Sequence, residues 1–157
     1  FLDRFEDVMG IGAELSSLGP TLQKTARHLG LEVSRPQELA LGQEAFVRSE
    51  QVVFAEAGIP SLLVSEGLKW RSTPREQAFA TLRAWMTERY HTPRDDLAQP
   101  IDFDAASEHA RLILVLVLAI ADNPLAPEWR PGVPYAYQRL LSLSDEAAGT
   151  ALPNEPL

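Results

Sequence analysis

The sequence contains no cysteine, which excludes disulfide bonds and metal sites built from thiolates. Any metal that the chain binds must be held by histidine and carboxylate side chains. Positive charge is also scarce, because 14 Lys and Arg face 22 Asp and Glu and the formal net charge is -8. This balance argues against nucleic acid and against an anionic membrane surface as partners, since both require clustered Lys and Arg.

Long apolar runs and the common catalytic motifs are missing as well. The longest apolar run, Leu112 to Ala121, is too short to span a bilayer. The chain has no HExxH, no His-x-Asp pair, no glycine-rich phosphate loop and no nucleophile elbow. It begins at Phe1 without a charged and apolar leader, which suggests a processed or cut product.

What is present is typical of one soluble globular domain. The chain has 157 residues, of which 45% are hydrophobic and 23% are charged. We expect a folded domain over residues 1–143 and a polar, disordered tail over 144–157.

The first half of the chain alternates short strands with helices. Asp7 to Leu15 predicts a buried strand, and Leu18 to Leu29 an amphipathic helix that Gly30 ends. Strand signals recur at 31–33 and at 61–64, the latter with the pattern of a strand buried on both faces. Between them, 35–43 is expected to be a loop, and Ser49 is expected to cap a short helix that Gly58 closes.

The second half of the chain is mostly helical. Pro74 opens an amphipathic helix that ends before His91, because the residue before a proline avoids the helical region. Asp102 or Asp104 caps a long, buried helix to about Ala121. A proline-rich segment and a short helix at 138–143 follow. The alternation predicts an α/β class with a largely parallel sheet.

Three histidines are the candidate metal ligands. His28 lies near the end of a helix and His109 within one, where surface or core roles are the simpler interpretation. His91 differs, because it lies in a loop within Tyr90-His91-Thr92-Pro93 and precedes Asp95-Asp96. It is either one ligand of a metal site or a loop histidine that hydrogen-bonds to a nearby carboxylate.

A hydrolytic zinc site needs two or three ligands for each ion, an open position for water and a carboxylate base. A phenol beside the metal can stabilise the oxyanion. Tyr90 and His91 supply the phenol and one ligand, which do not make a complete site. Arg48-Ser49-Glu50-Gln51 precedes a predicted helix, so it is either an anion-binding position or a capping arrangement.

The motifs occur in an order that resembles a known family. They are Phe5-Glu6-Asp7-Val8, Ile11-Gly12-Ala13-Glu14-Leu15-Ser16-Ser17-Leu18, Phe46-Val47-Arg48-Ser49-Glu50-Gln51, Phe54-Ala55-Glu56-Ala57-Gly58-Ile59-Pro60, Arg89-Tyr90-His91-Thr92-Pro93 and Asp95-Asp96. Over roughly residues 5–140 the chain resembles the C-terminal half of the co-catalytic zinc exopeptidases, which include bacterial leucyl aminopeptidases and glutamate carboxypeptidases. The resemblance implies a partial αβα sandwich with a mixed, mostly parallel sheet.

The resemblance also implies a function and site residues. In the intact parent two zinc ions would activate a water that attacks a peptide bond. The resemblance favours the peptide bond of the N-terminal residue, as in an aminopeptidase. His91 corresponds to the last zinc ligand and Tyr90 to the residue that polarises the scissile carbonyl. Arg48, Ser49 and Glu50-Gln51 correspond to the substrate pocket. The family suggests a periplasmic or secreted location.

Two departures limit what this chain can do by itself. It has Glu50-Gln51 where the family usually has Asp-His, and the family's other zinc ligands and general base lie upstream of the matched region. We therefore expect the chain alone to be inactive and to bind zinc weakly at most. Two alternatives stay open: a non-catalytic binding or structural domain, and self-association through the sheet edge that a partial sheet exposes.

Overall fold

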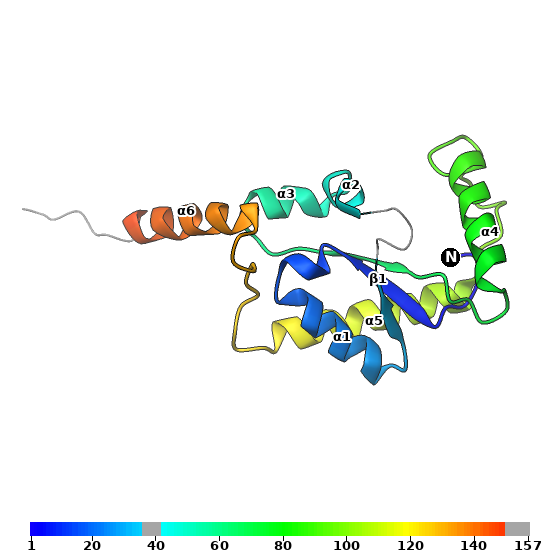
Figure 1. The fold of residues 1–157 in the computed structure, drawn as a ribbon, viewed down its shortest axis with the longest axis horizontal. Coiled ribbons are helices and arrows are strands. Elements are labelled where there is room, and N and C mark those ends of the chain that lie inside the picture. The colour runs from blue at the N-terminus through cyan, green and yellow to red at the C-terminus, as the bar shows by residue number, and fades with distance from the viewer. Residues whose placement is uncertain (36–41, 150–157) are drawn as a thin grey trace, which may run out of the picture.

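The computed structural model describes residues 1–35 and 42–149 (Figure 1). Within these residues, three strands, a short 3-10 helix and six α-helices follow one another. They are β1 (Asp7–Ile11), η1 (Ala13–Leu15), α1 (Leu18–His28), β2 (Glu32–Ser34), α2 (Gly42–Val47), α3 (Gln51–Glu56), β3 (Leu63–Glu66), α4 (Arg75–Glu88), α5 (Phe103–Ala121) and α6 (Pro134–Gly149).

The three strands form one mixed sheet in the order β2-β1-β3. β1 and β2 are parallel, with Asp7 opposite Glu32, and β1 and β3 are antiparallel, with Val8 opposite Glu66. The α/β class with a mixed sheet is therefore confirmed. One strand pairing is thus parallel and the other is antiparallel. After β2 the chain passes through α2 and α3 and then forms β3, which runs along β1 in the opposite direction.

The central strand separates two clusters of buried side chains. All five residues of β1 are buried, and alternate side chains of a strand point to opposite faces. Val8 packs into a cluster with residues of α1, α4 and α5, whereas Ile11 packs with Phe46 of α2 and with Trp129. Figure 1 shows α1 and α5 on one side of the sheet and α2, α3 and α6 on the other. This layering is compatible with part of an αβα sandwich.

Several predicted helix boundaries are confirmed. Gly30 follows α1 with a φ of 76°, and Gly58 follows α3 with a φ of 80°, the left-handed conformation expected after a helix end. Pro74 directly precedes α4. Asp102 caps α5, since its Oδ1 accepts a hydrogen bond from the Ala105 amide at 2.9 Å.

Two expectations about burial were wrong. The strand predicted at 61–64 is β3, an edge strand in the described sheet, and its Leu63 is exposed rather than buried on both faces. α5 buries Leu112 and Leu116 but exposes Leu114 and Val117, so it lies against the sheet layer by one face only. In α4, Ala78 is buried and Leu82 is partly buried against the same cluster as Val8. Neighbouring elements, rather than helix periodicity, determine which apolar faces are covered.

Some predicted boundaries also differ. α2 begins at Gly42, inside the segment predicted as a loop at 35–43. Ser49 does not cap α3, because its hydroxyl donates to the Ala45 carbonyl at 2.8 Å. α6 is longer than the helix predicted at 138–143 and includes 144–149 of the predicted tail. The rest of that tail, 150–157, lies outside the described residues, as does most of the predicted loop.

Within residues 1–35 and 42–149, no helix combines the length and the apolar character that crossing a membrane requires.

Candidate functional site

The turn after α4 positions the predicted metal ligand. α4 ends at Glu88, and the amides of Arg89 and Tyr90 donate to the Trp85 carbonyl at 2.9 and 3.1 Å. His91 follows with a φ of 56°, a left-handed conformation that non-glycine residues rarely adopt. Thr92 then closes the turn, because its hydroxyl donates to the Arg89 carbonyl at 2.7 Å. Backbone strain of this kind at His91 often accompanies a functional position.

The side chains of this turn form a stack of rings. The Tyr90 and His91 rings lie 3.8 Å apart between centroids and are tilted by 19°, and the Trp85 ring lies 5.3 Å from that of Tyr90. The Trp85 indole donates to the Gln99 side chain at 2.7 Å, which ties the stack to the following loop. Tyr90 is 40% exposed and His91 is exposed, so both rings are accessible at the surface.

The two acidic residues of the motif stabilise the same loop. Asp95 accepts a hydrogen bond from the Gln99 side chain at 2.8 Å, and Asp96 accepts one from the Ala98 amide at 2.9 Å. Both carboxylates therefore accept hydrogen bonds from within their own loop. No carboxylate among the described residues hydrogen-bonds to His91, whose ring contacts Tyr90 instead.

The second predicted segment lies at the junction of α2 and α3. Arg48 and Glu50 are exposed, whereas Gln51 is buried. The Gln51 side chain donates to the Phe46 carbonyl at 2.9 Å, and its backbone carbonyl accepts from the Ser61 hydroxyl at 2.7 Å. Gln51 therefore joins α2, α3 and the start of the segment that leads to β3. The substrate-binding role of this segment stays a prediction.

The structure does not bring the two predicted segments together. Figure 1 places α4 apart from α3 and from the junction of α2 and α3. Among residues 1–35 and 42–149, no three His, Asp or Glu residues are arranged to hold a metal ion. The residues described here therefore do not fit a zinc centre by themselves, and His91 is a single candidate ligand.

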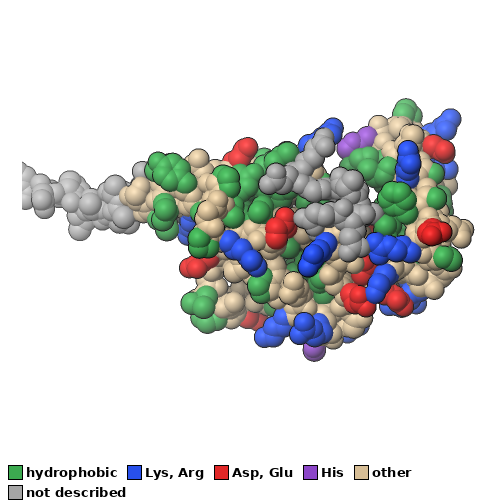
Figure 2. Space-filling model, viewed as in Figure 1, with side chains coloured by type: hydrophobic (Ala, Val, Ile, Leu, Met, Phe, Trp, Pro, Cys, Tyr) green, Lys and Arg blue, Asp and Glu red, His purple; other side chains and the backbone are tan. Residues whose placement is uncertain are grey.

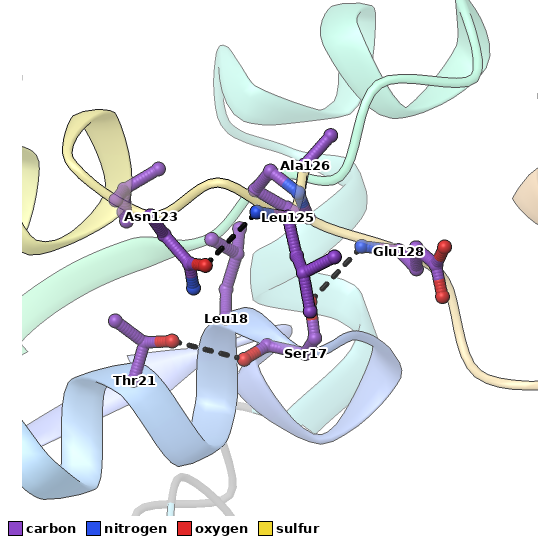
Figure 3. A pocket seen from close by; sticks show the side chains of 9 residues that line it. Ser17, Leu18, Thr21, Asn123, Leu125, Ala126 and Glu128 are labelled. Atoms are coloured by element: carbon purple, nitrogen blue, oxygen red, sulfur yellow. Dashed lines mark hydrogen bonds between the residues drawn. The ribbon is translucent and has the colours of Figure 1, made fainter.

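Two cavities among the described residues lie elsewhere. One of about 570 Å³ is lined by residues at the ends of β1 and β2 and by Arg35 and Arg130. Another of about 270 Å³ lies between the start of α1 and the segment after α5 (Figure 3). At its rim the Glu128 amide donates to the Ser17 hydroxyl at 3.0 Å. Neither cavity is lined by Tyr90, His91 or the Arg48–Gln51 segment.

Sequence reasoning did not predict that a carboxylate is part of the core. Asp7 is 1% exposed in the central strand. It accepts hydrogen bonds from the Ser34 hydroxyl and from the Lys69 amide, the latter at 2.7 Å. An acidic residue within an otherwise apolar strand was the available signal, since buried carboxylates require such partners.

His109 is a half-buried histidine with an aromatic surrounding. Its ring lies 5.0 Å from that of Phe1 and 6.3 Å from that of Phe5. Burial lowers the pKa of His109 below its ordinary value of 6.5, although the nearby Glu66 carboxylate acts in the opposite direction. Its Nδ1 is buried without a hydrogen-bond partner among the described residues. The core interpretation of this residue therefore agrees better with the structure than a ligand role.

Comparison with known proteins identifies the class. An α/β layer with a mixed sheet and a Tyr-His turn at a helix end is compatible with part of a metallopeptidase domain. The family model of peptidase family M28 matches residues 8–117, from β1 to the last turn but one of α5. The chain belongs to this family of metallopeptidases, which is generally zinc-dependent. No curated protein and no solved structure matches the chain.

Proposed function

We propose that this chain is the C-terminal part of a zinc-dependent exopeptidase of family M28, which removes N-terminal residues from peptides when the parent is intact. The family match over residues 8–117 carries the proposal, because it includes both segments predicted to form the site. The order of the motifs supports the same conclusion. The preference for an N-terminal over a C-terminal substrate rests on the resemblance alone.

Within such a parent, we assign roles to two residues of the ring stack. His91 would contribute one imidazole to the metal site, and the Tyr90 phenol would donate a hydrogen bond to the carbonyl oxygen under attack. The exposure of both rings supports these roles, because a substrate or a second chain segment can reach them. Arg48, Ser49, Glu50 and Gln51 would form the substrate-binding segment, and the hydrogen bond from the Gln51 side chain to the Phe46 carbonyl would hold this segment in place.

The chain by itself is proposed to be inactive. A peptidase centre needs several ligands and a general base, and one exposed imidazole cannot close such a site. By resemblance to the family, the missing groups would be a His-x-Asp pair, two further Asp residues and a Glu-Glu pair that includes the general base, supplied by polypeptide outside this chain.

Zinc titration followed by calorimetry, together with hydrolysis of a leucine anilide, tests the proposal. We expect weak zinc binding, no turnover by the chain alone, and turnover by a longer parent that is lost in His91→Ala. Tyr90→Phe in that parent should lower turnover and leave the zinc content unchanged. Tight stoichiometric zinc binding with turnover by the 157-residue chain would contradict the assignment, and so would full turnover by Tyr90→Phe.

The second candidate is a non-catalytic member of the family that serves as a binding or structural domain. The position of Gln51 favours it, because this side chain is used for packing where the family usually has histidine. The coding sequence upstream of Phe1 separates the two candidates. If it lacks His-x-Asp and Glu-Glu, the catalytic proposal fails and the non-catalytic one stands.

The compartment and the peptide substrate are proposed from the family resemblance, and the absence of nucleic-acid and membrane partners is proposed from the net charge of -8. We propose a periplasmic or secreted location, a peptide as the substrate of the parent, and no nucleic-acid or membrane partner. Fractionation of the source cells, with activity measured in each fraction, tests the location.

A further inference from the structure

α6 is anchored to the rest of the domain near its start. The Tyr135 ring lies 5.8 Å from that of Phe46 and 5.3 Å from that of Trp129. Gly58 touches the helix backbone, since a Cβ added there would lie 2.6 Å from the Arg139 amide nitrogen. Beyond this contact the helix extends away from the sheet and its covering helices (Figure 1). A helix of this length is marginal in water without tertiary packing.

The extended part of α6 carries exposed apolar side chains. Figure 2 shows hydrophobic side chains over both α6 and α3. We call the exposed large apolar residues of these two helices the α6 patch. They are Val53 and Phe54 of α3 and Tyr137, Leu140, Leu141 and Leu143 of α6.

The size of the α6 patch matches one half of a protein interface. Phe54, Tyr137 and Leu140 are 56%, 63% and 65% exposed. Six large apolar side chains with about half of their surface open expose on the order of 600 Å². The largest apolar patch of a monomer is roughly 300–600 Å², and each partner of a standard interface buries about 800 Å². The patch is therefore at the upper limit for a free surface and close to what a dimer buries.

We propose that the occupant of the α6 patch is a second copy of this chain. On α6 the side chains are symmetric about Leu140, with Tyr137 three residues before it and Leu143 three residues after it. Residues three apart lie on one helix face. Two antiparallel copies of α6 would thus place Leu140 on Leu140 and Tyr137 on Leu143, the self-complementary contact that a two-fold axis requires. This contact differs from pairing at the sheet edge.

The charge of the chain gives the association a characteristic salt dependence. Two copies with a net charge of -8 repel each other at long range, and salt screens this repulsion. The apolar contact itself does not depend on opposite charges. We therefore expect the dimer to become tighter as the salt concentration rises. A salt-induced weakening would indicate ion pairs and contradict an apolar contact at the patch.

Sedimentation equilibrium of the 157-residue chain over a concentration series tests the proposal. The unaltered chain should be a dimer. Leu140→Glu should raise the dissociation constant of the dimer by roughly 30-fold or more, which is the effect expected at a central interface residue. Leu140→Gln is the second variant, since it keeps a good helix former without adding charge. Circular dichroism establishes that each variant is folded before its association is compared.

Two matched controls separate this contact from other surfaces. Leu125→Glu places the same charge on an exposed leucine outside the patch, and it should leave the dimer unchanged. Leu63→Lys blocks the edge of β3, and it should also leave the dimer unchanged. A monomer at all concentrations, a dimer unaffected by both Leu140 variants, or dissociation by Leu63→Lys would each overturn the proposal. None of these outcomes depends on zinc or on peptidase activity.

Discussion

The contact between Asp7 and Gly67 makes a quantitative prediction about the core. Asp7 lies in β1, and its carboxylate accepts from the Ser34 hydroxyl and from the Lys69 amide at 2.7 Å. Gly67 lies directly against this carboxylate, because a Cβ added there would overlap all three terminal atoms of the Asp7 side chain. The glycine is required by space, since its backbone is outside the left-handed region. Each of the two residues therefore limits what the other can be.

The single substitutions should both destabilise the chain. Asp7→Ala leaves the Lys69 amide without its acceptor, and a lost hydrogen bond to a charged group costs about 1.5–3 kcal/mol. Gly67→Ala introduces overlap with a buried side chain, which costs about 1–3 kcal/mol. The overlap disappears in the double variant, because alanine at position 7 lacks the three atoms that an added Cβ would meet.

The double variant should thus be less destabilised than the sum of the two single variants, with a coupling of about 1–3 kcal/mol. Urea unfolding followed by circular dichroism measures all four proteins. Asp7→Asn is the control that keeps the side-chain volume, and it should retain the clash with Gly67→Ala. Additive effects of Asp7→Ala and Gly67→Ala would refute the packing described here.

Two further predictions concern α6 and the half-buried histidine. Gly58→Ala should destabilise the chain, by about 1–3 kcal/mol on unfolding in urea, because its Cβ would meet the Arg139 backbone and its φ of 80° disfavours a side chain. Unchanged stability would show that α6 does not depend on this contact. Burial lowers the pKa of His109 in the folded chain below 6.5, so the unfolded chain takes up a proton first as the pH falls. The contribution of His109 to the free energy of unfolding is fully present above about pH 6.5. Below that pH it decreases until the folded chain is also protonated. His109→Leu should flatten the difference in unfolding free energy between about pH 7.5 and about pH 5.5, and an equal slope in both proteins would contradict it.

Local signals in the sequence predicted the ends of α1 and α3 and the starts of α4 and α5. Gly30 and Gly58 end helices because glycine adopts the left-handed conformation without strain, and Asp102 caps one because its carboxylate reaches free amides. Each of these signals involves atoms within a few residues. The α/β class was predictable for a similar reason, since strand and helix periodicities are read within one segment.

Burial was predicted poorly, because it depends on neighbours far along the chain. An apolar run such as 112–121 is compatible with burial on all sides, but α5 meets the other elements on one face. β3 looks like a central strand in sequence and lies at an edge of the described sheet. The same limit applies to the site, where only the structure places the Gln51 side chain against the Phe46 carbonyl.

The sequence by itself determined the family, the α/β class and the residues His91 and Tyr90 as candidates, because ordered motifs and local conformational preferences are properties of the chain alone. Only the tertiary structure decided that β3 runs antiparallel to β1, that Asp7 is buried and that α6 projects with an uncovered apolar face. These features arise where distant segments meet. The free energy of such contacts depends on which side chains share a space, and the order of residues along the chain does not specify that in advance.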